Sequence, residues 1–160
     1  MAPAPDAAVH HVPSTDGVTL AVHDLGGDGP LVLLCHPTGF LGMTWAPFAA
    51  HLTGVAHCVA LDFRGHGDST TPDTLDLSWS GMCDDVLAVV DHLGGGPLLG
   101  AGHSMGGAAL LMAEQRRPGT FSRLWLYEPI VFPRPEGAPA GPNPLAEGAR
   151  RRRPAFPSRD

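Results

Sequence analysis

Ser104 is the residue whose type and neighbours point most clearly to chemistry. It lies in the stretch AGHSMGG (101–107), which follows an apolar run and precedes the helix-forming run AALLMAEQRR. A serine between two glycines, placed where a strand turns into a helix, is typical of a nucleophile held on a strained, exposed turn. Gly102 and Gly106 leave room on both sides, where a β-carbon would collide with neighbouring chain. The spacing therefore predicts covalent catalysis by the Ser104 hydroxyl.

The elements that must position Ser104 alternate between strand and helix. Short apolar runs typical of strands occur at 18–25, 30–36, 55–63, 97–104 and 122–132. Runs with apolar residues at helical spacing occur at 44–52, 77–93 and 106–117. Ser78 is the expected N-cap of the second helix. Strands separated by helices of this length form right-handed crossovers and a parallel sheet, so the predicted fold class is α/β.

Four motifs, in this order along the chain, carry a resemblance to a known family. They are CHPTGF (35–40), DFRGHGDS (62–69), GHSMGG (102–107) and YEP (127–129). Together they resemble the N-terminal half of an α/β-hydrolase. The resemblance implies a partial α/β-hydrolase fold, with a mostly parallel sheet flanked by helices and without the last strands and most of the cap. It divides the chain into a flexible N-terminus (1–16), a core (17–132) and a Pro-rich loop with the start of a basic cap segment (133–160).

The serine in this nucleophile elbow is similar to that of the esterases, lipases, thioesterases and cofactor-free haloperoxidase-like members of the family. It differs from the nucleophile of the dehalogenases, which is an aspartate. The resemblance therefore implies an esterase-like serine hydrolase that acts on an ester, thioester or related acyl substrate. The expected partner is a small molecule, and no metal or cofactor is implied.

The resemblance also implies two N–H donors for the oxyanion of an acyl-transfer intermediate. Met105, directly after the nucleophile, is expected to supply one of them. The loop that follows the strand at 30–36 is expected to supply the other. The family pattern has glycine after the histidine, whereas this chain has Pro37, which carries no N–H. Thr38 is therefore the expected donor, and Gly39 or Phe40 would be chosen by an alternative alignment.

The acid and the base of a catalytic triad follow the serine in this family, in the order serine, acid, histidine. Glu128 closes the last expected strand, where some members are similar in placing their acid, although most place an aspartate one strand later. A carboxylate there would orient the histidine and stabilise its imidazolium. The alternative is that Glu128 hydrogen-bonds the cap loop and has no part in the triad.

No histidine follows Ser104, because His103 is the last of the nine. His66 lies in a turn that resembles a structural turn of the family, His36 is expected beneath the oxyanion loop, and His103 is expected to point into the structure. None of these positions fits a general base. One hypothesis is a truncated serine hydrolase, inactive as given, whose histidine is supplied by sequence not present here. The alternative is a non-catalytic fragment or pseudo-hydrolase with at most a binding role.

Composition argues against several other function classes. The formal net charge is -6, but six of the ten arginines lie in residues 134–160. The cluster at 150–153 has no interleaved aromatic residues, which favours a solvated face over a nucleic-acid site. The N-terminus lacks the pattern of a secretory signal, and no run approaches the roughly 20 apolar residues that span a bilayer. We therefore expect a soluble cytoplasmic protein that binds neither nucleic acid nor membrane.

Three cysteines are present, and their spacing does not predict a metal site. Cys35, Cys58 and Cys83 are odd in number and include no CxxC pair. Free cysteines are usually buried and act as small apolar side chains. Buried thiols are therefore predicted.

Overall fold

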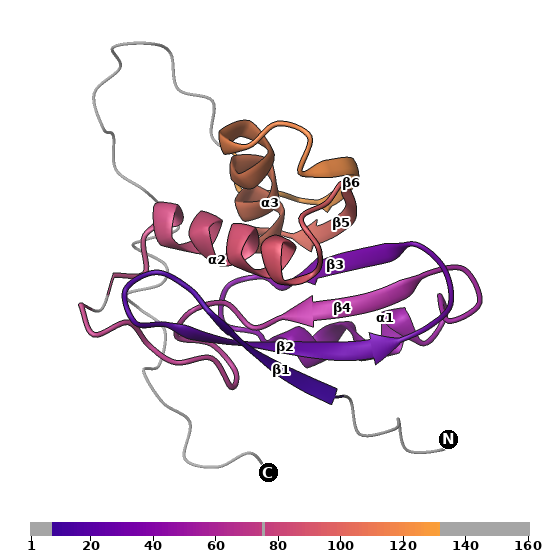
Figure 1. Ribbon diagram of the computed structural model, residues 1–160, viewed down its shortest axis with the longest axis horizontal. Coiled ribbons are helices and arrows are strands. Elements are labelled where there is room, and N and C mark those ends of the chain that lie inside the picture. The colour runs from indigo at the N-terminus through magenta and orange to yellow at the C-terminus, as the bar shows by residue number, and fades with distance from the viewer. Residues whose placement is uncertain (1–7, 75, 132–160) are drawn as a thin grey trace.

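Six strands form one sheet in the computed structural model of the protein, which describes residues 8–74 and 76–131 (Figure 1). The strands are β1 (Ala8–Pro13), β2 (Thr19–Gly26), β3 (Leu31–Cys35), β4 (His57–Leu61), β5 (Leu98–His103) and β6 (Phe121–Tyr127). They lie in the order β1-β2-β4-β3-β5-β6. The pairs β1–β2 and β2–β4 are antiparallel, whereas β4, β3, β5 and β6 run parallel. The predicted α/β class and mostly parallel sheet are confirmed.

Helices cover both faces of this sheet. They are the 3-10 helix η1 (Gly42–Trp45), α1 (Ala46–Ala49), α2 (Trp79–His92) and α3 (Met105–Arg116). The helices α2 and α3 lie on one face of the sheet, and α1 lies on the other (Figure 1). The helix predicted at 44–52 is shorter than expected and begins as a 3-10 turn. Ser78 caps α2 as predicted, because its hydroxyl oxygen accepts a hydrogen bond from the Gly81 N–H.

Apolar side chains of the central strands point alternately to the two faces. In β3, Leu33 and Cys35 belong to the core cluster beneath α2 and α3, whereas Val32 and Leu34 belong to the cluster beneath α1. Successive side chains of a strand leave opposite faces of its sheet, so a strand that is covered on both faces must be apolar throughout. This explains why the sequence of β3 is a continuous apolar run.

The strand β1 lies within residues 1–16, for which the sequence predicted a flexible segment. That prediction is wrong for Ala8–Pro13, which pairs with β2 from Ala8 opposite Asp24 to Pro13 opposite Thr19. Only Val12 of this strand is buried. The strand is held mainly by main-chain hydrogen bonds at the sheet edge, and such bonds leave little apolar pattern in a sequence.

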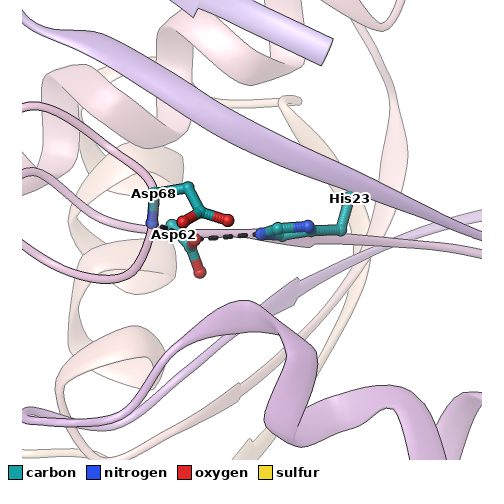
Figure 2. Close-up of side chains that lie close together, drawn as sticks. All are labelled: His23, Asp62 and Asp68. Atoms are coloured by element: carbon teal, nitrogen blue, oxygen red, sulfur yellow. Dashed lines mark hydrogen bonds and ion pairs between the residues drawn. The ribbon is translucent and has the colours of Figure 1, made fainter. Parts of the chain in front are cut away.

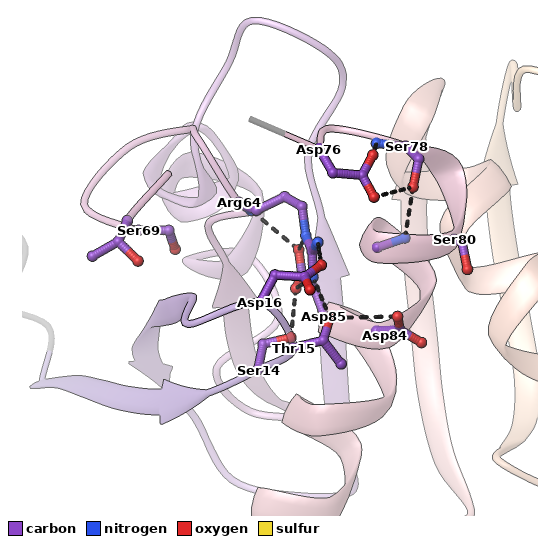
Figure 3. A network of polar contacts seen from close by, with 12 residues as sticks. Ser14, Thr15, Asp16, Arg64, Ser69, Asp76, Ser78, Ser80, Asp84 and Asp85 are labelled. Atoms are coloured by element: carbon purple, nitrogen blue, oxygen red, sulfur yellow. Dashed lines mark hydrogen bonds and ion pairs between the residues drawn. The ribbon is translucent and has the colours of Figure 1, made fainter. Parts of the chain in front are cut away.

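A buried ion pair anchors the turn after β4 to α2 (Figure 3). The side chains of Arg64 and Asp85 are fully buried, and the Arg64 Nε and Nη2 atoms donate to the two carboxylate oxygens at 2.9 and 2.8 Å. The Ser14 hydroxyl donates to the same carboxylate at 2.7 Å, and Arg64 Nη2 also donates to the Thr15 hydroxyl at 2.9 Å. The pair therefore joins the β1–β2 turn, the turn after β4 and helix α2.

Three other expectations concern the cysteines, membrane-spanning helices and residues 133–160. The three cysteines are buried and free, as predicted. None of the helices in the described part of the chain is long and apolar enough to cross a membrane. The Pro-rich loop and basic cap segment predicted at 133–160 lie outside the described residues.

Candidate active site

Ser104 lies at the junction of β5 and α3, as the glycine spacing predicted. Its main chain has φ 52° and ψ -112°, and a positive φ is strained for a residue with a side chain. Within the described ranges, three non-glycine residues have positive φ, and two of them, Ser104 and Glu128, directly follow the neighbouring strands β5 and β6. The backbone at Ser104 therefore has the strained turn of a nucleophile elbow.

Two glycines allow the chain to turn this sharply. A β-carbon at Gly102 would lie 2.7 Å from main-chain atoms of Gly106 and Gly107. A β-carbon at Gly106 would lie 2.2 Å from the carbonyl oxygen of Cys35, in the neighbouring strand β3. Only glycine at both positions lets α3 begin this close to β5 and β3. The serine is thereby brought beside the carboxyl end of β3, from which the predicted oxyanion loop leaves.

Met105 is the first residue of α3 and is 1% exposed. The first N–H groups of a helix have no acceptor within the helix, and the helix dipole favours negative charge at this end. The Met105 N–H is therefore available next to Ser104. This position fits the predicted oxyanion donor.

The main chain of Ser104 is hydrogen-bonded to residues on both sides of Glu128. The Ser104 N–H donates to the carbonyl oxygen of Tyr127 at 3.0 Å, and the Ser104 carbonyl oxygen accepts from the Ile130 N–H at 3.2 Å. Tyr127 also pairs with His103 in the parallel ladder between β5 and β6. Glu128, which is exposed, therefore lies next to Ser104 at the same edge of the sheet. The two residues of the triad predicted within this chain are brought together by their main chains.

The loop between β3 and η1 contains a tight turn at 37–40. The Phe40 N–H donates to the carbonyl oxygen of Pro37 at 3.2 Å, and Gly39 has φ 79°. Phe40 therefore already uses its N–H within the turn. Among the described residues, no acceptor meets the N–H of Thr38 or of Gly39. Of the three donors left open by the sequence, the geometry disfavours Phe40 and leaves Thr38 and Gly39 available.

A buried carboxylate, Asp62, holds the far end of this loop. Figure 2 shows it beside His23 and Asp68. Asp62, directly after β4, accepts hydrogen bonds from the Gly42 N–H, from the Asp68 N–H at 2.8 Å and from His23 Nε2 at 2.9 Å. Burial raises the pKa of Asp62, but the hydrogen bonds from His23, Asp68 and Gly42 outweigh it and hold the pKa below its usual value. Because η1 begins at Gly42, Asp62 fixes the point where the loop after β3 rejoins the fold.

His23, Asp62 and Asp68 are also the group within the described residues whose side chains are close enough to share a metal ion. Their ligand atoms lie within 4.8 Å of one another. The Asp62 oxygens, however, already accept two main-chain N–H groups and the His23 ring. The hydrogen bond to Asp62 raises the pKa of His23 even though burial lowers it. The hydrogen bonds from His23 and from the two main-chain N–H groups therefore already occupy the Asp62 oxygens.

Three histidines lie within the motifs, and each has a close neighbour in the structure. His36 is fully buried, and its Nδ1 and Nε2 atoms contact the Pro37 carbonyl oxygen and the Phe63 N–H. His66 Nδ1 donates to the carbonyl oxygen of Arg64 at 3.0 Å. The His103 ring packs against the Tyr127 ring, with centroids 4.9 Å apart. His36 therefore has no free ring nitrogen to act as a base.

Comparison with known proteins identifies the family. Residues 32–160 match the sequence model of the Alpha/beta hydrolase family. The chain belongs to this family. Lipase LipV of Mycobacterium tuberculosis is 34% identical over 117 residues, which are 71% of this chain and 43% of that protein. A probable protein phosphatase methylesterase 1 of Caenorhabditis elegans is 41% identical over 98 residues, which are 58% of this chain and 27% of that protein.

A solved structure agrees with this assignment to the family. The N-formylmaleamic acid deformylase Nfo of Pseudomonas putida S16 superimposes with a TM-score of 0.70 at 29% identity, over 82% of this chain and 52% of that one. The chain thus spans between a quarter and about half of the length of these relatives.

An apolar hollow of about 310 Å³ lies on the α1 side of the sheet of this α/β-hydrolase. Phe48, Leu99 and Trp125 are among the residues that line it, and Ser104, Thr38 and Glu128 are not. The sequence did not predict this hollow. The sequence also did not predict which groups are hydrogen-bonded to Asp62 and to the two ring nitrogens of His36, because these groups include residues that are distant in the sequence.

Proposed function

We propose that this chain carries the nucleophile, the oxyanion hole and the triad acid of a serine hydrolase that cleaves small carboxylic esters through an acyl-enzyme. The observation that carries the proposal is the strained turn at Ser104. The main chain of Ser104 is hydrogen-bonded to Tyr127 and Ile130, which lie on either side of Glu128 in the sequence. Names of similar proteins that include a methylesterase and a lipase favour an ester over a thioester substrate.

In the proposed reaction, the Ser104 oxygen attacks the ester carbonyl carbon while a base takes the hydroxyl proton. The carbonyl oxygen becomes an oxyanion, which accepts hydrogen bonds from the N–H groups of Met105 and Thr38. The C–O bond to the alcohol then breaks, and the alcohol leaves with the proton returned by the base. Water, activated by the same base, attacks the acyl-enzyme in the reverse sequence and releases the acid and free Ser104.

The base is the part of the mechanism that these residues do not supply. No histidine follows Ser104, and both ring nitrogens of His36 are hydrogen-bonded. We assign the base to a histidine outside these 160 residues, held by Glu128. The carboxylate would fix the orientation of the imidazole and stabilise its protonated form. The share of the relatives' length that this chain spans supports the assignment.

The test uses p-nitrophenyl acetate, a small activated ester, and free imidazole as a substitute base. Without imidazole, the chain should hydrolyse this ester hardly faster than its Ser104→Ala variant, because losing a triad member reduces the rate on the order of 10⁴ to 10⁶-fold. With imidazole, an acetyl group should appear on the peptide that contains Ser104, as measured by mass spectrometry. Ser80→Ala, which removes an exposed hydroxyl on α2, is the matched control and should not change the result.

Two outcomes would overturn parts of this proposal. If no acetyl group appears on the Ser104 peptide when imidazole is present, the alternative, a pseudo-hydrolase with at most a binding role, is favoured. Saturable turnover without imidazole that is lost in Ser104→Ala would show that one of the nine histidines already acts as the base.

A further inference from the structure

His36 has a hydrogen-bonding arrangement that determines where its proton lies. The ring is fully buried directly after β3, with Nδ1 2.8 Å from the carbonyl oxygen of Pro37 and Nε2 3.2 Å from the main-chain nitrogen of Phe63. A carbonyl oxygen can only accept a hydrogen bond, and a main-chain N–H can only donate one. His36 must therefore be neutral, with its proton on Nδ1 and a lone pair on Nε2.

The surroundings of His36 favour this neutral form. The pKa of the ring is lowered to about 4, mainly because the ring is buried. The hydrogen bond to the Pro37 carbonyl and the charge of Asp62 oppose this shift, and the nearby His66 ring adds to it. The Phe63 and His66 rings lie at centroid distances of 5.2 and 5.1 Å and restrict the ring plane. Both the proton and the orientation of the ring are thus held.

The acceptor of this hydrogen bond belongs to the peptide group that carries the predicted oxyanion donor. The Pro37 carbonyl and the Thr38 N–H form one planar trans peptide, so they point in opposite directions. The carbonyl accepts from His36 Nδ1 and also from the Phe40 N–H at 3.2 Å. With the carbonyl held from two sides, the direction of the Thr38 N–H is determined. No acceptor among the described residues meets that N–H.

The loop also begins beside the nucleophile. In the parallel ladder between β3 and β5, Cys35 pairs with Gly102, so His36 and His103 are the next residues along the two strands. Gly106 at the start of α3 approaches the Cys35 carbonyl closely enough to exclude a β-carbon. The peptide held by His36 therefore leaves the sheet at the edge where Ser104 lies.

We infer that His36 is a positioning residue that, through its Nδ1–H bond to the Pro37 carbonyl, aims the Thr38 N–H at the oxyanion formed on Ser104 attack. This role rests on the proposed function. In this proposal the two ring nitrogens of His36 have different roles. The Nδ1 side orients the oxyanion peptide, whereas the Nε2 side ties the ring to the turn after β4.

Two substitutions of His36 by residues with an amide side chain separate the roles of the two ring nitrogens. In His36→Asn, the side-chain NH₂ lies near the place of Nδ1 and can still donate to Pro37, but the acceptor for Phe63 is lost. In His36→Gln, the side-chain oxygen lies near the place of Nε2 and can still accept from Phe63, but the donor to Pro37 is lost. Each variant loses one buried hydrogen bond, so urea unfolding should show similar losses of stability for the two.

The two variants should differ at Thr38 and in reactivity. In ¹⁵N-labelled chain, the Thr38 amide resonance should stay near its wild-type position in His36→Asn and move in His36→Gln. The rate of Ser104 acetylation by p-nitrophenyl acetate, with imidazole added, should fall about 10² to 10³-fold in His36→Gln, the effect of losing one oxyanion donor. His36→Asn should restore most of that rate.

Each result decides one point. Equal losses of acetylation in both variants, or a Thr38 amide that is unchanged in His36→Gln, would mean that His36 only stabilises the fold. If the wild-type chain shows no Ser104-dependent acetylation, the proposed function fails, and the Thr38 resonance still tests whether His36 orients the peptide.

Discussion

Replacing Asp85 with asparagine should reveal how strongly the buried Arg64 pair stabilises this fold. The Asp85 carboxylate accepts two hydrogen bonds from the Arg64 guanidinium, one from the Arg64 N–H and one from the Ser14 hydroxyl. Asparagine replaces one acceptor oxygen with an NH₂ group and removes the negative charge. The Arg64 side chain remains fully buried, and its remaining carboxylate neighbour, Asp16, lies 3.6 Å away and is 44% exposed.

The expected loss of stability follows from leaving the buried Arg64 charge without its partner. Removing one member of a buried ion pair reduces the free energy of unfolding by about 3–5 kcal/mol. Domains of this kind have about 5–15 kcal/mol of stability in total, so the loss should be a large fraction of it. Urea unfolding followed by tryptophan fluorescence measures the change directly.

The neighbouring Asp84 on the same helix provides the matched control. It pairs with Arg116, and the side chains are 28% and 40% exposed. Exposed ion pairs contribute about 0–1 kcal/mol, so Asp84→Asn should change the free energy of unfolding by no more than that. If Asp85→Asn and Asp84→Asn reduce the free energy of unfolding by equal, small amounts, the burial of the Arg64–Asp85 pair is not what stabilises this part of the fold.

A double replacement tests the same reasoning from the other side. Arg64→Met combined with Asp85→Leu removes both charges together and fills the space with apolar groups. Replacing a whole buried pair in this way is often neutral, so the double variant should recover much of the stability lost in Asp85→Asn. A double variant that is as unstable as the single one would show that the hydrogen bonds to the turns matter more than the charge.

Two further predictions concern the edge of the sheet where Ser104 lies. The His36 pKa is lowered to about 4 in the fold, whereas an unfolded histidine takes up a proton near pH 6.5, so the free energy of unfolding should fall by about 3 kcal/mol between about pH 6.5 and about pH 4. In His36→Asn, urea unfolding should show a smaller dependence of this free energy on pH. A pH dependence equal to that of the wild type would show that the ring is not held neutral. Gly106→Ala should destabilise the chain by about 1–3 kcal/mol or more, because its β-carbon would lie 2.2 Å from the Cys35 carbonyl oxygen. Gly54→Ala, where no atom lies within 4 Å of the new β-carbon, is the control, and equal thermal unfolding midpoints for the two alanine variants would contradict the close approach of α3 to β3.

Several features of this protein could be predicted from short stretches of its sequence. The turn at Ser104 follows from Gly102 and Gly106, since the absence of a β-carbon is a property of the residue itself. The strained turn predicted there is observed as a positive φ at Ser104. The N-cap at Ser78 is equally local, because its hydroxyl bonds to an N–H three residues later. Continuous apolar runs predicted the central parallel strands, because strands covered on both faces have no polar side to show.

Other features were decided by contacts between residues far apart in the chain. The strand at Ala8–Pro13 exists because its main chain pairs with β2, and main-chain pairing depends little on side-chain type. The hydrogen-bond partners of Asp62 and His36 could not be predicted, because the N–H groups that they accept from belong to the distant residues Gly42 and Phe63. The steric effect of glycine and the capping of a helix act within a few residues, and both can therefore be predicted from the sequence. The protonation of a buried ring, and the direction of the peptide that it holds, depend on which distant groups the folded chain places against it.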